Sequence, residues 1–186
     1  MNIFDTRDDM IAALVPKNGV YAELGIFKGD FSKKLHSILQ PSKLLLIDLF
    51  DGMVGSGDQD GNNFSVINIA DVYKTLQLDN RFTLLKGDTS SILATFQDNT
   101  FDMVYIDADH SYNGCKKDLD IAFLKVKPGG WIMGHDYEIN KNKAKREWVF
   151  GVRKAVDEFC KKHNLSIDAK GMDGCVSYAI KIPMTS

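Results

Sequence analysis

The sequence contains few cysteines and no long hydrophobic run. Cys115, Cys160 and Cys175 are widely spaced and odd in number, and none belongs to a CxxC pair. This pattern favours reduced thiols in an intracellular protein over a disulfide framework. No apolar stretch approaches the roughly 20 residues that a membrane-spanning helix needs, and the amino terminus, MNIFDTRDDM, is acidic and polar. We therefore expect a cytoplasmic protein without a membrane partner.

The sequence also lacks an excess of charge of one sign. The formal net charge is −2 and the isoelectric point is about 6.1, so no global positive field would attract nucleic acid or anionic lipid. A small, weakly charged partner is favoured instead. With 186 residues, of which 44% are hydrophobic, the chain can bury a sizeable core. We expect one domain spanning residues 1–186.

Short apolar runs alternate with helix-like segments. The runs, rich in β-branched and aromatic residues, are 20–24, 43–48, 81–87, 101–107, 130–135 and 175–182. The helix-like segments are 30–39, 65–76, 89–96, 113–124 and 148–163. Near-continuous apolar runs are typical of strands buried on both faces, so the alternation predicts a parallel sheet with helices on both sides. LSIDA, at 165–169, is another candidate strand, and a hairpin with the last run would add antiparallel strands at one edge.

A glycine pair follows the first predicted strand, in VYAELGIFKGDF at 20–31. The loop after the first strand of a doubly wound sheet passes beneath the cofactor. Gly25 would permit a positive φ or a close backbone approach, and Gly29 would let the next helix begin without a Cβ clash. The dinucleotide fingerprint is GxGxxG, but this loop has Glu23 in place of the first glycine. A carboxylate there suits a cationic ligand better than a pyrophosphate, although the glycines alone equally fit an ordinary turn.

Acids end the next two predicted strands. Asp48 stands where a carboxylate can accept both hydroxyls of a ribose, or where it can cap a turn. Asp88, in LLKGDTSS, could receive an adenine amino group, or serve as the N-cap of the helix that begins at Thr89. Both acids therefore have a structural alternative.

Five stretches carry a resemblance to a known family. AELGIFKGDFS, LLLIDLF, LKGDTSS, FDMVYIDADHSY and LKVKPGGWIMGHDY, in that order across 22–137, resemble the successive motifs of class I S-adenosylmethionine-dependent methyltransferases. The resemblance implies an α/β Rossmann-like, doubly wound sheet of seven mostly parallel strands, with an antiparallel C-terminal strand. It also implies S-adenosylmethionine as the cofactor, with Glu23 and the glycines at its methionine portion, Asp48 at the ribose and Asp88 at the adenine. The remaining expected cofactor contacts are Leu24, Leu49, Gly87, Thr89 and Asp107.

Acids and histidines follow the fourth and fifth strands, in YIDADHSYNG and GHDY. We expect Asp107, Asp109, His110, His135 and Asp136 to converge, and such oxygen and nitrogen ligands suit Mg²⁺ or Mn²⁺. The segment resembles metal-dependent small-molecule O-methyltransferases, nearest the sugar-modifying branch related to macrocin O-methyltransferase. The resemblance implies Asp107 and Asp136 as metal ligands. His135 stands where that branch often has a second acid, and as a third ligand it suits Mn²⁺ better than Mg²⁺.

The expected catalytic residues are Asp107, His110 and His135. A divalent metal would lower the pKa of an acceptor hydroxyl and hold its oxygen in line with the sulfonium methyl, while His110 or Asp107 takes the proton. In the structural alternative, the two histidines bond strand-end backbone and Asp109 caps the following helix.

The sequence thus predicts an O-methyltransferase of a small molecule, with a sugar or glycan hydroxyl ahead of a catechol-like phenol. A non-catalytic S-adenosylmethionine-binding module is an alternative. An NAD-dependent oxidoreductase is disfavoured by the missing first glycine and by the lack of a Tyr-x-x-x-Lys pair after the fourth strand. The loops 51–63 and 138–148 could close over the site or steer an anionic acceptor. We expect acceptor recognition to come from loops, from a second copy in a homodimer, or from the rest of a larger enzyme.

Overall fold

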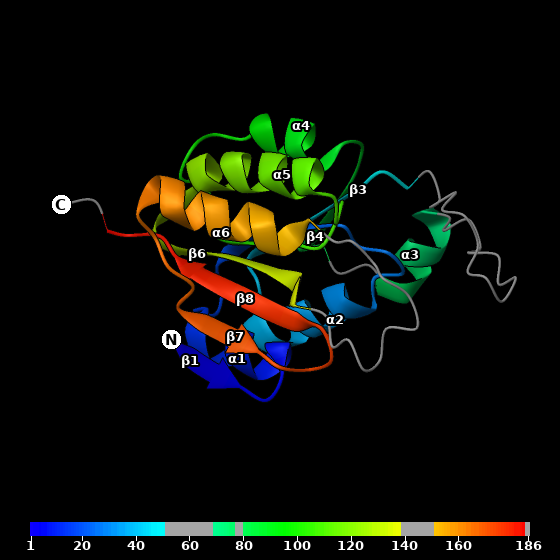
Figure 1. The fold of residues 1–186 in the computed structure, drawn as a ribbon. Coiled ribbons are helices and arrows are strands. Elements are labelled where there is room, and N and C mark those ends of the chain that lie inside the picture. Colours follow the sequence, from blue (N-terminus) through cyan, green and yellow to red (C-terminus); the bar gives the residue numbers. More distant parts are fainter. Residues whose placement is uncertain (51–68, 77–79, 139–150, 185–186) are drawn as a thin grey trace, which may run out of the picture.

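The computed structural model describes residues 1–50, 69–76, 80–138 and 151–184 (Figure 1). The strands are β1 Asn2–Phe4, β2 Val20–Leu24, β3 Lys43–Asp48, β4 Phe82–Lys86, β5 Phe101–Ile106, β6 Val126–Glu138, β7 Ala169–Gly171 and β8 Val176–Lys181. The helices are α1 Arg7–Leu14, α2 Asp30–Leu39, α3 Ile69–Leu76, α4 Thr89–Ala94, α5 Tyr112–Lys125 and α6 Val152–His163. None of the helices in these ranges is long and apolar enough to cross a bilayer.

The sheet is mostly parallel, as the sequence predicts. Its strand order is β1-β7-β8-β6-β5-β2-β3-β4. β8 runs antiparallel to its neighbours β6 and β7, whereas the other described pairs are parallel. The order turns back at β2, beside β5, and the ligand crevice of an open α/β sheet lies at such a switch point. The antiparallel C-terminal strand is confirmed.

The amino-terminal segment adds an eighth strand to the seven predicted. Asn2 pairs in parallel with Ala169 at the edge of the sheet, and α1 follows directly. Thr6 caps α1, because its hydroxyl oxygen accepts the amide of Asp9 at 3.0 Å. A three-residue strand is too short to show a period, but the Thr-x-x-Asp capping pattern was a usable signal for the helix.

Most element bounds agree with the sequence prediction to within a few residues. Residues 20–24, 30–39 and 43–48 match their elements end to end. β6 is longer than predicted, and β7 begins at Ala169, the last residue of LSIDA. Parts of two predicted helices, 65–68 and 148–150, lie outside the described residues, as does the loop 51–63.

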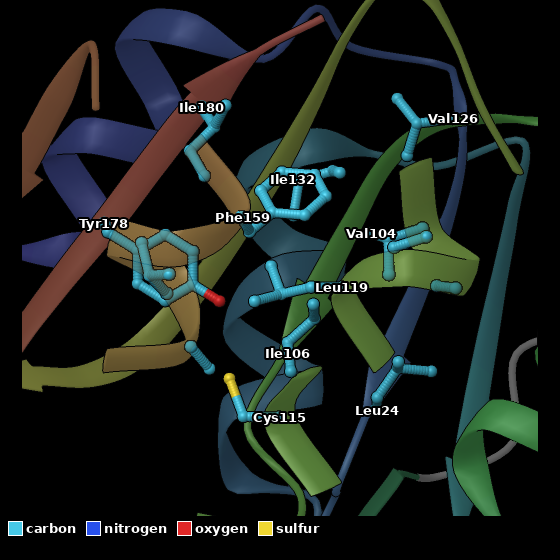
Figure 2. Packing of buried hydrophobic residues seen from close by; sticks show 14 of the residues in the cluster. Leu24, Val104, Ile106, Cys115, Leu119, Val126, Ile132, Phe159, Tyr178 and Ile180 are labelled. Carbon is cyan, nitrogen blue, oxygen red and sulfur yellow. The ribbon is translucent and has the colours of Figure 1, made fainter. Parts of the chain in front are cut away.

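Helices cover both faces of the sheet, which explains the continuous apolar runs. In Figure 1, α4, α5 and α6 lie over one face, and α1 and α2 lie over the other. Along β5, Val104 and Ile106 face the first group (Figure 2), where Leu119 of α5 and Phe159 of α6 pack. Tyr105, between them, faces the second group. A strand covered on both sides needs apolar residues at every position, so its alternation is lost.

α2 starts at the site edge of the sheet and buries one side. Phe31, Leu35 and Leu39, spaced four residues apart, are all buried, and this spacing gives one continuous apolar stripe on a helix. Gln40 ends the helix in the left-handed conformation, with its amide bonded to the His36 carbonyl at 2.9 Å. The packing of this stripe fixes where the amino terminus of α2 lies.

Candidate active site

Four acids mark the carboxyl edge of the parallel strands. Glu23 lies near the end of β2 and Asp48 ends β3, while Asp107 follows β5 and Asp136 lies near the end of β6. Parallel strands end at the same edge of a sheet, so the four side chains belong to one region. This is the edge at which the sequence predicts the ligand-binding residues.

Positions 25 and 29 both favour glycine, but for different reasons. Both have positive φ, 83° and 84°. A Cβ at Gly25 would overlap the backbone carbonyl of Asp107, whereas a Cβ at Gly29 would come no closer than 3.4 Å to Leu76 and Val72. Gly25 therefore permits a close approach between the loop and the end of β5, and Gly29 supplies a left-handed N-cap for α2.

Asp48 holds the glycine loop in place. Its Oδ2 accepts the amide of Ile26 at 2.7 Å, and its Oδ1 accepts the amide of Phe50 at 2.9 Å. Oδ2 also accepts the amide of Phe27 at 3.3 Å. The turn-capping alternative is thus realised, and Oδ1 keeps a lone pair that can accept a hydroxyl donor. Two apolar side chains lie exposed at this edge, Phe27 by 52% and Leu49 by 49%.

Asp88 and Thr89 serve the start of α4. Asp88 Oδ1 accepts the amide of Ser91 and the hydroxyl of Ser90, both at 2.8 Å, and these bonds lower the pKa of Asp88. The hydroxyl of Thr89 donates to the buried Asp118 of α5 at 2.8 Å. Asp88 is therefore an N-cap, and the Thr89 side chain is turned toward α5.

Glu23 is a buried carboxyl with an unmet hydrogen-bonding need. It is 1% exposed, and no described residue bonds its Oε2. Burial raises the pKa of Glu23 to about 8, opposed by the nearby Ser32 hydroxyl and reinforced by the charge of Asp107. The next residue, Leu24, packs into the core, so only its backbone faces the loop.

Asp107, His110 and Asp136 form one cluster. His110 Nε2 lies 2.8 Å from Asp136 Oδ2 and 3.4 Å from Asp107 Oδ1. Burial alone would lower the pKa of His110, but hydrogen bonds and negative charge from the two carboxylates raise it to about 10. The three residues offer ligand atoms within 4.8 Å of one another.

His135 does not join Asp107 in a common cluster. Its Nδ1 lies 2.8 Å from Ser177 Oγ, which in turn lies 3.3 Å from the buried Tyr105 hydroxyl. In the described ranges, His135 groups with Asp136 and Cys175 instead. The predicted ligand set of Asp107, His135 and Asp136 is therefore divided between two clusters that share Asp136.

A backbone irregularity in β6 lies at Asp136, the residue that the two clusters share. Asp136 has φ 58°, and the pairing of β6 with β8 shifts register between Gly134 and Glu138. Successive residues of a regular strand point to opposite faces, whereas a bulge redirects a side chain. No pattern in the sequence predicts a left-handed aspartate at this position.

Arg7 belongs to the site although sequence reasoning missed it. Its Nη1 lies 3.6 Å from Asp107 Oδ2 and 3.4 Å from the Tyr105 hydroxyl, to which it donates. The guanidinium also stacks 3.9 Å from the centre of the Phe31 ring. Asp109, by contrast, accepts the amide of Ser111 at 2.8 Å, but Ser111 is the N-cap of α5, so the expected capping role does not fall to Asp109 itself.

The donor sets fit the groups that such a site would bind. Two carboxylates and one imidazole suit Mn²⁺ better than Mg²⁺, which prefers oxygen ligands alone. The unpaired buried oxygen of Glu23 fits a positively charged group such as an ammonium or a sulfonium. The amino terminus of α2, at Gly29, favours a carboxylate.

The sheet order and the acids at its carboxyl edge define a class I S-adenosylmethionine-dependent methyltransferase. A family of methyltransferase domains matches residues 4–137, and the chain belongs to that family. No curated protein matches the sequence.

Solved structures agree with this class. The O-methyltransferase NovP has a TM-score of 0.67 at 18% identity, covering 95% of this chain and 79% of its own. The N-methyltransferase NodS from Bradyrhizobium japonicum WM9 has a TM-score of 0.64 at 13% identity, covering 95% and 94%. An O-methyltransferase from Bacillus cereus, solved in complex with S-adenosylhomocysteine, has a TM-score of 0.61 at 16% identity, covering 94% and 78%. At these identities the likeness establishes the fold.

Proposed function

We propose that the protein transfers the methyl group of S-adenosylmethionine to a hydroxyl of a small molecule, with a divalent metal ion. As the acceptor, we favour a sugar or glycan over a catechol-like phenol. The observation that carries the proposal is the cluster of Asp107, His110 and Asp136, at the same sheet edge as the unpaired carboxyl of Glu23. The likeness to NovP, an O-methyltransferase, supports it.

The cofactor contacts follow from charge. S-adenosylmethionine carries an ammonium and a sulfonium. The buried Glu23 oxygen can accept a hydrogen bond from the ammonium, and the positive charge of the ammonium would stabilise the ionised form of Glu23. Asp48, already fixed by three backbone amides, has a lone pair left on Oδ1 for a ribose hydroxyl. Asp88 is exposed at the end of β4 and can receive the adenine amino group through an oxygen not used in capping. The remaining contacts with S-adenosylmethionine would come from the backbone of Leu49, Gly87 and Thr89 or from their place beside the cofactor.

The reaction forms a bond between the acceptor oxygen and the methyl carbon and breaks the bond between that carbon and sulfur. The acceptor hydroxyl must lose its proton, and the sulfonium becomes a neutral thioether. Asp107 and Asp136 are the residues that would hold the metal, which when bound lowers the pKa of a coordinated hydroxyl. The contacts with both carboxylates raise the pKa of His110 to about 10, so its ring holds a proton near neutral pH. A metal ion held by Asp107 and Asp136 would remove the negative charge that raises this pKa, and His110 could then take the departing proton. Exclusion of water would strengthen each of these interactions.

His135 takes a different role from the one the sequence suggested. Its ring is held by Ser177, and it reaches the reaction cluster only through its neighbour Asp136. We therefore assign the metal of this reaction to Asp107 and Asp136, with His110 as the nearest nitrogen. A second copy of the chain, or the remainder of a larger enzyme, would supply acceptor contacts.

Calorimetric titration of the metal-free protein with S-adenosylhomocysteine, with NADH as the control ligand, tests the proposal. Saturable binding of S-adenosylhomocysteine alone is expected, and binding of NADH alone would contradict it. A screen with methyl-labelled S-adenosylmethionine then compares sugars, phenols and amines. Transfer only to amines would retain the methyltransferase and overturn the O-specificity, an outcome that the likeness to NodS makes worth including.

A further inference from the structure

Cys175 lies in the turn between β7 and β8, where the chain passes beside the end of β6. Its sulfur, one ring nitrogen of His135 and one carboxylate oxygen of Asp136 all lie within 4.8 Å of one another. Two groups of potential metal ligands occur in the part of the chain that the structure describes, and of these the Cys175 group is the one with sulfur. The other, around Asp107 and His110, offers only oxygen and nitrogen.

The backbone is distorted where these ligands meet. Asp136 is a non-glycine residue at φ 58°, and Gly174, just before Cys175, has φ 109°. Without the distortion, the consecutive residues His135 and Asp136 would point to opposite faces of β6. Left-handed backbone at a non-glycine residue costs free energy. In this chain it also occurs at helix ends such as Gln40, but Asp136 lies within a strand. Here its result is that both side chains reach the same cluster.

We propose that His135, Asp136 and Cys175 form a binding site for a borderline transition-metal ion, with Zn²⁺ the first choice. Thiolate and imidazole ligands favour Zn²⁺ over Mg²⁺ or Mn²⁺. Tetrahedral Zn²⁺ holds its ligand atoms about 3.5 Å apart, so the three side chains, whose ligand atoms lie within 4.8 Å of one another, need to close by at most about 1.3 Å. The thiol proton leaves to the solvent when the ion binds. Cys175 is partly exposed, which gives the ion access.

Ser177 contacts the His135 ring and can fix its orientation in this site. Its hydroxyl lies 2.8 Å from His135 Nδ1 and 3.3 Å from the buried Tyr105 hydroxyl. A hydrogen bond to one ring nitrogen fixes the orientation of the imidazole and leaves the other nitrogen for an ion, as outer partners of metal-bound histidines do. The arrangement would select Nε2 as the ligand atom.

The binding of Zn²⁺ stands on these residues alone, but its consequence rests on the proposed function. Asp136 Oδ2 lies 2.8 Å from His110 Nε2, so an ion held by Asp136 and Cys175 draws on a carboxylate that the reaction cluster also uses. We expect Zn²⁺ at this site to weaken the binding of Mn²⁺ by Asp107 and Asp136.

Substitution of Co²⁺ for Zn²⁺ tests the site directly, in reduced, full-length protein without a histidine tag. The wild type should show the near-ultraviolet sulfur-to-cobalt charge-transfer band, and Cys175→Ser should lose it. Cys160→Ala, which alters a cysteine of α6 outside the cluster, is the matched control and should keep the band. Zn²⁺ affinity, measured by competition with a chromophoric chelator, should fall at least about tenfold in Cys175→Ser and in His135→Asn.

Absence of the band in the wild type, or wild-type Zn²⁺ affinity in both Cys175→Ser and His135→Asn, would overturn the inference. Asp107→Asn should keep the band, because Asp107 is outside this cluster. Titration of the same samples with S-adenosylhomocysteine separates the two claims. An intact band without nucleoside binding overturns the proposed function alone, and nucleoside binding without the band overturns the zinc site alone.

Discussion

Arg7 Nη1 lies 3.6 Å from Asp107 Oδ2, which links the first helix of the chain to the residue that follows β5. Arg7 also contacts Asp173, at 3.6 Å from its Nε, and stacks on Phe31. One guanidinium thus joins α1, α2, the end of β5 and the turn before β8. The amino-terminal segment, which the sequence shows as acidic and polar, supplies the positive charge next to the reaction cluster.

Replacing Arg7 by Met should change stability and metal affinity in opposite directions. Met keeps much of the packing on Phe31 but leaves Asp107 without its cation, so the free energy of unfolding should fall by about 2 kcal/mol in urea titrations. Because a positive charge beside Asp107 is removed, Mn²⁺ should bind several-fold more tightly. Arg7→Lys restores the charge and should reverse the second effect. Weaker Mn²⁺ binding in Arg7→Met would contradict this role.

Gly25→Ala and Gly29→Ala form a matched pair. Both substitutions place a Cβ at positive φ, which costs about 1 to 2 kcal/mol. Only at Gly25 does the Cβ also overlap the Asp107 carbonyl, so Gly25→Ala should cost about 3 kcal/mol or more. Chemical unfolding of the two variants measures the difference. Equal losses would mean that the loop moves away from β5 without penalty.

Glu23 should make the protein less stable as the pH rises. Its folded pKa is raised by burial to about 8 from 4.5, so the stability that the neutral carboxyl provides is complete below pH 4.5 and is lost as the pH rises to 8. The loss attributable to Glu23 is roughly 3 to 5 kcal/mol. In Glu23→Gln, unfolding free energies measured from pH 5 to pH 8 should fall less steeply. Some slope should stay, because burial raises the pKa of Asp118 to about 7.

Asp88 has a structural role that can be separated from its proposed role in cofactor binding. Asp88→Ala removes the N-cap of α4 and should lower the free energy of unfolding by about 1 kcal/mol, whereas Asp88→Ser keeps the cap. If Asp88 also receives the adenine amino group, both variants should bind S-adenosylhomocysteine more weakly. Normal binding of S-adenosylhomocysteine by Asp88→Ser would mean that Asp88 acts only as the N-cap of α4. Thermal unfolding and calorimetric titration of the two proteins give the two readouts.

The sequence was informative where local pattern decides the structure. Strands buried on both faces leave continuous apolar runs, and a polar side chain follows where each run ends. This pattern predicts that Asp48, Asp107 and Asp136 lie at the edge of the sheet. The apolar spacing of Phe31, Leu35 and Leu39 likewise defined α2 to the residue.

Contacts between distant segments could not be predicted in this way. Arg7 is 98 residues from Tyr105, and no spacing rule relates the two. The choice between His110 and His135 as the partner of Asp107 depends on the register shift in β6, which redirects consecutive side chains. An irregularity of this kind arises from pairing with β8, which comes later in the chain, so the ligand set follows from tertiary structure.

Asp107 and Asp109 provide the sharpest test of the reaction cluster, because they are two acids of the same loop with different contacts. Asp107 lies 3.4 Å from His110 Nε2 and belongs to the metal-ligand group, whereas the carboxylate of Asp109 accepts hydrogen bonds from Ser111. Asp107→Asn should therefore weaken Mn²⁺ binding at least about tenfold, as measured by electron paramagnetic resonance of the free ion. Asp109→Asn removes the same charge two residues away and should change the affinity by less than about threefold, since exposed charges are screened. Similar losses in both variants would mean that Mn²⁺ responds to the overall charge of the loop, and the assignment of Asp107 as a ligand would be wrong.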